Sequence, residues 1–365
     1  MFRSQVGFVA MSANGLMEIS ANNQGEIKLW KLNHDLLKPL KAHEHKIWDV
    51  ATSPDGKLIA STSVDQTLKL WRSDGTLLQT LKDNKSTVFR TAVFSQDSRM
   101  LVTGSVDQQV QIWDISNPET SEIKLLKTFA GHQAPVNALA IAPDGKTIAS
   151  GDNKTIRLWN FEGKLLHSFP AHNQIIWRLG FSPDGQFIAS ASADGTAKIW
   201  RVADGLLAAT LNHDGPVWGV AFSPQGNLVV TSSRDGNLKL WELDGTLLKT
   251  IPNLSGLNRL AISPDGKIIA TAGVDTNVKL WSNTGELLAI LPGHQSMVFS
   301  VAFTADGNFL VSGGEEGTMI IWNLKNILAL KPLNYACNWV QDYLQTNVEV
   351  EEGDRDLCKG VELGK

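Results

Sequence analysis

A tryptophan that closes a short phrase of alternating polar and apolar residues recurs along nearly the whole chain, at intervals of 40 to 46 residues. The eight positions are Trp30, Trp71, Trp113, Trp159, Trp200, Trp241, Trp281 and Trp322. A constant period of about 40 residues that ends on a tryptophan is typical of arrays of small four-stranded sheets. We therefore expect a chain built from repeated copies of one structural unit.

Each unit also carries turn residues at two recurring places. Ser182-Pro-Asp-Gly185 exemplifies the first turn, in which proline presets φ and glycine accepts a positive φ. Asp194-Gly195 exemplifies the second, which favours a tight hairpin between antiparallel strands. Short apolar runs lie between these turns, and the helical period is absent until about residue 335. The pattern predicts an all-β chain.

The number of units decides how the chain closes. One sheet cannot bury both of its faces, so the units must stack around an axis, and a closed ring removes exposed strand edges. Eight tryptophan phrases favour eight blades, and the alternative is seven blades with residues 1 to about 40 left over. Only five residues precede the first predicted strand at Val6. We therefore expect the last blade to take its outer strand from about Asn326 to Pro332, and hydrogen exchange to be fastest in residues 1–40.

Composition and charge exclude several classes of protein. The chain has 33 basic and 37 acidic residues and a net charge of −4, so nucleic acid is not expected as a general partner. No run of 18 apolar residues predicts a membrane span, and the N-terminus shows no clear cleavage signal. Cys337 and Cys358 are too few for a disulfide framework. We expect a soluble, cytoplasmic protein that does not bind membranes.

Gly131-His132 and Gly293-His294, each followed by the first turn and a closing tryptophan, resemble WD40 repeats. The resemblance covers about Val6 to Leu330 and implies a WD40 β-propeller of four-stranded blades over residues 1–332. It also implies a hydrogen-bonded group of histidine, serine or threonine, aspartate and tryptophan in each regular blade. These groups are His43, Ser61, Asp65 and Trp71; His172, Ser190, Asp194 and Trp200; and His213, Thr231, Asp235 and Trp241.

Three units depart from this pattern. The unit that ends at Trp113 has Asn84 near the histidine position, and the unit that ends at Trp281 lacks the histidine. The first unit has Gln24 where the family has aspartate. We expect these blades to be held more by packing and to be looser.

Residues 333–365 form a separate C-terminal tail in this interpretation. Trp339, Val340, Tyr343 and Leu344 have helical spacing, which predicts a short amphipathic helix. The tail resembles the segment that follows WD40 arrays in large bacterial signalling proteins of the cyanobacterial type. That resemblance implies the sensor part of a signalling system, although the chain contains no GxxxxGK[ST] phosphate loop. The alternative is a helix that only packs on the propeller.

The resemblance also implies which residues surround the central channel on the top face, where the first strand of each blade begins. They stand five positions before the serine of the first turn, and the same count selects Gly7 in the first unit. This count gives Trp48, Arg90, Asn137, Trp177, Trp218, Asn258 and Phe299, while Arg178 and Arg259 follow at the next position and Arg234 precedes Asp235 at a hairpin tip on the same face. These ten are the predicted partner-binding residues. Tryptophan and arginine are enriched at binding hot spots. The alternative is that the aromatic side chains only cover the channel or pack on neighbouring blades.

The function favoured by these features is a non-catalytic scaffold or ligand-sensing propeller that binds a protein or peptide. His43, His132, His172, His213 and His294 fall in different blades, so no metal site, cofactor or catalytic residue is predicted. A propeller enzyme would need convergent acids, bases or metal ligands in the channel. A pure oligomerisation or capping module would show concentration-dependent self-association.

Overall fold

The computed structural model describes residues 6–11, 18–22, 27–29, 37–82, 87–119, 122–253 and 255–329. The chain divides into two compact units, Met1–Lys38 with Trp322–Lys365 and Pro39–Ile321. Strands dominate the described residues, and α1 (Leu324–Ala329) is their one helix. No described helix is long and apolar enough to cross a membrane. The all-β prediction is confirmed.

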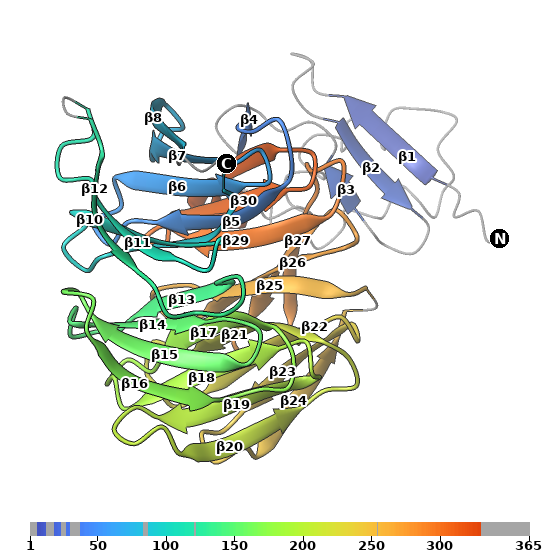
Figure 1. The fold of residues 1–365 in the computed structure, drawn as a ribbon. Coiled ribbons are helices and arrows are strands. Elements are labelled where there is room, and N and C mark those ends of the chain that lie inside the picture. Colours follow the sequence, from blue (N-terminus) through green and yellow to red (C-terminus); the bar gives the residue numbers. More distant parts are fainter. Residues whose placement is uncertain are drawn as a thin grey trace, which may run out of the picture. The chain divides into compact units, whose positions relative to one another are not determined.

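Seven four-stranded sheets follow one another along the chain, coloured from blue through green to orange in Figure 1. The first three are β5 (Ile47–Thr52), β6 (Leu58–Ser63), β7 (Thr67–Arg72) and β8 (Leu77–Lys82); β9 (Phe89–Phe94), β10 (Met100–Ser105), β11 (Val110–Asp114) and β12 (Lys124–Phe129); and β13 (Ala138–Ile141), β14 (Thr147–Gly151), β15 (Thr155–Asn160) and β16 (Leu165–Pro170).

The next three sheets repeat this order. They are β17 (Ile176–Phe181), β18 (Phe187–Ser192), β19 (Thr196–Arg201) and β20 (Leu207–Asn212); β21 (Val217–Phe222), β22 (Val229–Ser233), β23 (Asn237–Trp241) and β24 (Leu247–Pro252); and β25 (Leu257–Ile262), β26 (Ile268–Gly273), β27 (Val278–Ser282) and β28 (Leu287–Leu291). The seventh sheet is β29 (Val298–Phe303), β30 (Phe309–Gly314), β31 (Thr318–Asn323) and β4 (Leu37–Lys41).

The first strands of the seven sheets form a closed circle around a channel. Each of β5, β9, β13, β17, β21, β25 and β29 contacts the next, and β29 contacts β5. The prediction of eight blades is therefore wrong, and the seven-bladed alternative is confirmed. The first sequence unit forms a separate three-stranded sheet of β1 (Val6–Met11), β2 (Glu18–Asn22) and β3 (Ile27–Leu29). Gly7 therefore belongs to this separate sheet and not to one of the seven inner strands.

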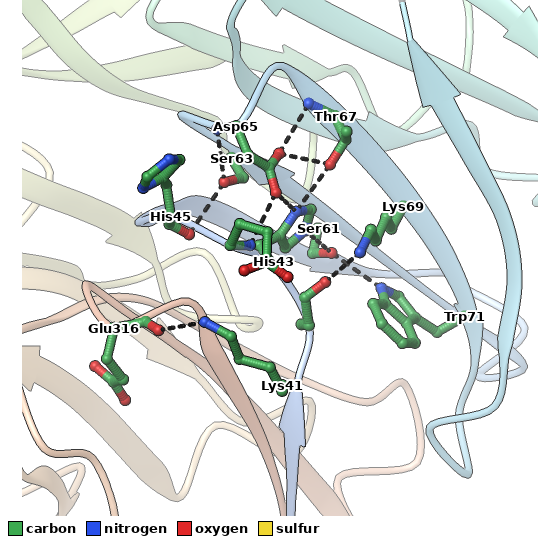
Figure 2. A network of polar contacts seen from close by, with 12 residues as sticks. Lys41, His43, His45, Ser61, Ser63, Asp65, Thr67, Lys69, Trp71 and Glu316 are labelled. Carbon is green, nitrogen blue, oxygen red and sulfur yellow. Dashed lines mark hydrogen bonds and ion pairs between the residues drawn. The ribbon is translucent and has the colours of Figure 1, made fainter.

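The ring is sealed by a strand from the N-terminal side of the sequence. β4 is hydrogen-bonded to β31 as the outer strand of the seventh sheet. Lys41 Nζ donates to the Glu316 carbonyl oxygen at 3.3 Å, as Figure 2 shows, and Leu40 packs against the cluster that contains Val311 and Met319. The expected outer strand near Asn326 is wrong, because that segment begins in α1. The seam rests on strand pairing, since an unpaired edge would leave backbone groups unsatisfied.

The core consists of apolar clusters between adjacent blades, and six closing tryptophans are part of one: Trp71, Trp113, Trp159, Trp200, Trp241 and Trp281. Trp241, for example, is 5% exposed and packs with Ile199 and Leu211 of the preceding blade. The fold is therefore stabilised by contacts between neighbours around the ring.

The predicted glycine turns are confirmed, and in three blades a residue other than glycine takes the left-handed position of the hairpin. Gly195 has φ +85° in its hairpin, and Gly185 has φ +72°. The residues that replace a hairpin glycine also have positive φ: Gln66 at +68°, Gln108 at +71° and Thr276 at +65°. Left-handed backbone is unfavourable for side chains other than glycine, above all for a β-branched one. These three hairpins carry local strain.

Several sequence predictions fall outside the described residues. They concern Trp30, Gln24, Asn84, Cys337, Cys358, and the helix and tail predicted over residues 333–365.

Candidate functional site

A chain of hydrogen bonds runs through the blade formed by β5 to β8 (Figure 2). Trp71 Nε1 donates to Ser61 Oγ at 2.9 Å, and Ser61 Oγ lies 2.7 Å from His43 Nε2. His43 Nδ1 lies 3.0 Å from the Asp65 carboxylate. Every member of this buried group has a partner, as a stable polar network requires. The predicted group of four side chains is confirmed.

The same network recurs around the ring. The other two predicted groups, which contain His172 and His213, have corresponding distances of 2.7 to 2.9 Å. Two further blades contain it through histidines that the sequence had identified. His132 contacts Asp152 and Ser150, and His294 contacts Glu316 and Ser312.

The direction of the donors determines the protonation state of these histidines. Ser61 Oγ accepts from the Trp71 indole, so its own proton is available for His43 Nε2. His43 then carries its proton on Nδ1 and donates it to Asp65. Burial lowers the pKa of His43 to about 4, which favours the same neutral form. The histidines are structural, and no group of acids, histidines or cysteines in the described residues could hold a metal ion.

The two described blades that lack the histidine use different hydrogen-bond partners. Trp281 Nε1 donates to Thr271 at 2.9 Å, Asn253 stands at the position of the histidine, and the link to the aspartate is made by Lys279. Its Nζ donates to Asp275 at 2.5 Å and to the Asn253 side chain at 2.8 Å. In the other departing blade, Trp113 Nε1 donates to Thr103 at 2.9 Å. The polar link between strands is kept, and the expected looseness of these blades stays a prediction.

A recurring β-bulge positions the residues predicted for the top face. In β5, Ile47 pairs with Ser63 and Asp49 with Thr62, which leaves Trp48 without a partner in β6. The same register shift isolates Arg90, Trp177, Trp218, Asn258 and Phe299 in their strands. A bulge re-aims a side chain and is common beside functional sites. Together with Asn137, which directly precedes β13, these residues line one pocket at the channel mouth.

Four aromatic side chains form a continuous belt around this mouth. The Trp177 and Trp218 rings stack, with centroids 4.4 Å apart and planes inclined by 14°. Trp218 lies 6.5 Å from Phe299, and Phe299 packs edge-on against Trp48 at 5.8 Å. Such pairs stabilise by about 0.5–1.5 kcal/mol beyond their buried area. The aromatic belt therefore does pack on itself across blades, as the packing alternative expects.

Three cations lie over the aromatic belt. Arg90 is 4.0 Å from the Trp48 ring centroid and Arg234 is 4.7 Å from that of Trp218. Lys46 Nζ lies 3.9 Å from the Trp48 centroid and 3.8 Å from that of Phe299. Sequence reasoning missed Lys46, although this lysine stands two residues before Trp48, which was predicted to lie on the top face. The mouth is both aromatic and positively charged.

These cations have few acidic neighbours. Burial lowers the pKa of Lys46 and of Arg234, and Glu315 opposes the effect in both. Burial also lowers the pKa of Arg90, where no carboxylate of the described residues opposes it. Arg90 Nε and Nη1 are buried without a hydrogen-bond partner in the described protein. Arg90 is therefore a partly buried cation without a counter-ion, which is unfavourable unless an anion binds to it.

The space at the mouth is small because the aromatic belt fills it. The pocket has a volume of about 30 Å³ and is lined by the seven mouth residues together with Arg259. About one water molecule fits such a volume. A binding partner would therefore lie across the belt.

Arg178 lies apart from the mouth. Its Nη1 atom is 3.5 Å from Asp49 Oδ2, and it lines a second cavity at the opposite end of the inner strands. Arg259 links the mouth to Asp49, since it lines the mouth and contacts the other carboxylate oxygen of Asp49. Asp49 also accepts from Thr91 at 2.8 Å. Sequence reasoning missed Asp49, because an aspartate at that position occurs in one blade only and belongs to no repeat.

Two family models match the chain. The model described as WD domain, G-beta repeat, matches residues 34–72, 245–282 and 285–323. The model described as IFT122 first beta-propeller matches residues 69–250. The matched ranges together run from residue 34 to residue 323, which is the part of the chain that forms the seven sheets.

Curated relatives match a shorter part. The chain is 36% identical over 73 residues to the serine-threonine kinase receptor-associated protein of Mus musculus, which is 20% of this chain and 20% of the relative. It is 35% identical over 94 residues to Protein HIR1 of Kluyveromyces lactis, which is 22% of this chain and 11% of the relative. The chain therefore matches only a fraction of the length of these proteins.

Proposed function

Because the chain is a seven-bladed WD40-repeat β-propeller, we propose that it is a non-catalytic interaction scaffold whose top face binds an extended protein segment. WD40 families are in general interaction modules, and the repeated histidines and aspartates are occupied inside the blades. A fold does not name a ligand, so the proposal depends on the chemistry of the mouth.

The observation that carries the proposal is the set of bulged inner-strand residues. Six bulges present aromatic, arginine or asparagine side chains at one place, although a regular strand would bury or pair these positions. Trp177 Nε1 and Asn258 Oδ1 are buried there without a partner in the described protein. Aromatic anchors with unsatisfied polar atoms between them are typical of protein-binding surfaces.

The charge at the mouth indicates the partner's chemistry. Lys46, Arg90 and Arg234 stand against Glu315, so a segment with aspartate or glutamate would complement the surface. Such a carboxylate would supply acceptors for Arg90 Nε and Nη1. We favour a protein over a nucleic acid, because three cations at one mouth neutralise few phosphates and the chain's net charge is −4.

The signalling role remains part of this proposal. It depends on the resemblance of the tail, which lies outside the described residues, to segments of bacterial signalling proteins. The relatives named above are eukaryotic, so they do not support the bacterial resemblance.

Selection from a random twelve-residue peptide library on the full chain tests the proposal. The matched control is Trp177→Ala with Trp218→Ala, which removes the stacked half of the belt. We expect selected peptides to be rich in acidic residues and to bind the double variant at least tenfold more weakly. Arg90→Met should weaken the acidic binders while leaving their neutral amide analogues unchanged.

The outcomes separate the competing functions. Peptides that bind both forms equally would place the interaction elsewhere on the protein. Selection without binders, together with concentration-dependent light scattering, would favour the oligomerisation module. Binding of single-stranded oligonucleotides that Arg90→Met abolishes would favour nucleic acid over protein.

A further inference from the structure

A second cavity lies in the central channel at the end opposite the mouth. Its volume is about 390 Å³, within the range of small-molecule sites. The ends of β5, β17, β21, β25 and β29 form its wall. The lining residues are mostly apolar and include Phe181, Ile262 and the nearly buried Phe222 and Phe303, but polar groups form a large part of the surface that faces the cavity. A cavity of this size holds about thirteen water-sized groups, at roughly 30 Å³ each.

Arg178 is the only charged residue among the described residues that line this cavity. Its side chain is 25% exposed, whereas those of Arg259 and Asp49 are 9% and 2% exposed. It makes no hydrogen bond to the described protein, and its one ion pair is the 3.5 Å contact with Asp49. The guanidinium donors of Arg178 are therefore available to a molecule in the cavity.

Asp49 cannot satisfy Arg178, because other donors already occupy it. One carboxylate oxygen accepts from Ser300 at 3.0 Å and contacts Arg259. The other accepts from Thr91 at 2.8 Å. The buried centre of the channel thus contains two guanidinium groups and one carboxylate.

This imbalance of charge is unfavourable at a buried place. Burial and the nearby Arg259 lower the pKa of Arg178 to about 10, against the opposing effect of Asp49. At neutral pH Arg178 nevertheless remains charged, so the channel keeps one uncompensated positive charge. Uncompensated charge in a largely apolar setting favours the entry of an anion.

The hydroxyl groups of the wall do not compete for that anion. Thr52 Oγ1 donates to the Phe303 carbonyl oxygen at 2.6 Å, and Thr304 Oγ1 donates to Asp306 at 2.6 Å. One cation therefore faces an open cavity lined mostly by apolar residues, an arrangement suited to a molecule with one anionic end and an apolar body.

We propose that this cavity binds a small amphipathic carboxylate, with its carboxylate on Arg178 and its hydrocarbon chain among Phe181, Phe222 and Phe303. The guanidinium would hold the carboxylate through two parallel hydrogen bonds. The apolar wall would bury the chain. The site is separate from the top face, so this inference does not depend on the proposed function.

Isothermal titration of the full chain with octanoate, and with octan-1-ol as the neutral match, tests this site. We expect octanoate to bind at least tenfold more tightly than the alcohol. Arg178→Gln should reduce octanoate affinity at least tenfold and remove its advantage over the alcohol. Melting curves of each variant show whether the fold is retained.

A second variant fills the cavity and leaves Arg178 in place. Gly180 lines the cavity, and a Cβ there would meet only the Val220 carbonyl oxygen, at 3.9 Å. Gly180→Val should therefore fold and lose at least tenfold in octanoate affinity. The inference is overturned if octanoate does not bind below its micelle-forming concentration, if the alcohol binds equally well, or if both variants keep wild-type affinity.

Discussion

The indole rings of Trp177 and Trp218 stack across two adjacent blades, with their centroids 4.4 Å apart. Both side chains are partly exposed, and both stand at β-bulges. The closing tryptophans differ, since Trp200 is 6% exposed and donates to Ser190. The chain therefore contains two classes of tryptophan with different physical roles.

Substitution of one tryptophan from each class should separate these roles. We expect Trp200→Ala to lower the free energy of unfolding by about 3–5 kcal/mol, because it leaves a core cavity and removes the partner of Ser190. Trp218→Ala should cost only about 1–2 kcal/mol, because its contacts are a stack and a cation. Chemical denaturation measures both values. Equal losses would show that the aromatic belt is part of the structural core.

The buried histidines predict a specific dependence of stability on pH. The folded pKa of His43 is about 4, below the ordinary histidine pKa of about 6.5, so between these values the unfolded chain binds a proton that the folded chain does not. Stability is fully present above pH 6.5 and falls as the pH decreases toward 4, by about 3 kcal/mol for His43 alone. Burial lowers the pKa of His132, His172 and His213 in the same direction.

Denaturation curves between pH 7.5 and 4 provide the measurement. His43→Gln should flatten the slope of unfolding free energy against pH in that window. His45→Gln is the matched control, because His45 is exposed and lies two residues away. Equal slopes in the two variants would contradict the assignment.

The strained hairpins predict a stabilising substitution. Thr276 has φ +65° where corresponding hairpins have glycine, so Thr276→Gly should raise the free energy of unfolding by about 1 kcal/mol. Thr284→Gly is the control, because that turn residue does not have positive φ. It should be neutral or destabilising. A loss of stability at position 276 would argue against strain there.

Pairing of β4 with β31 predicts where the ring opens first. Leu40→Asp places a charge beside the Val311 and Met319 cluster and should cost about 2–3 kcal/mol. Leu126→Asp is the control on another outer strand, since Leu126 is 50% exposed. Hydrogen exchange should accelerate in β31 for the first variant only. In the unsubstituted protein, β4 should exchange as slowly as other outer strands, which revises the expectation for residues 1–40.

Local sequence determined the blade. The turn residues, the alternating apolar runs and the side chains of the hydrogen-bonded network all act within about 30 residues of one another, so one unit contains the information for its own folding. That is why the groups around His43, His172 and His213 were predictable. The link through Asn253 and Lys279 was not predictable, since other residue types make it.

Only the tertiary structure decided the closure of the ring and the composition of the channel. Eight phrases were countable, but whether residues 37–41 complete the first unit or the last one depends on which edge is unpaired when the ring closes. Likewise, Asp49, Arg178 and Arg259 stand at the same position of three repeats, but their inner strands are not adjacent, and the repeat alone does not show that the three side chains meet. They interact because ring closure brings distant strands around one axis. Burial at that axis strengthens the electrostatic effect of two guanidinium groups beside one carboxylate.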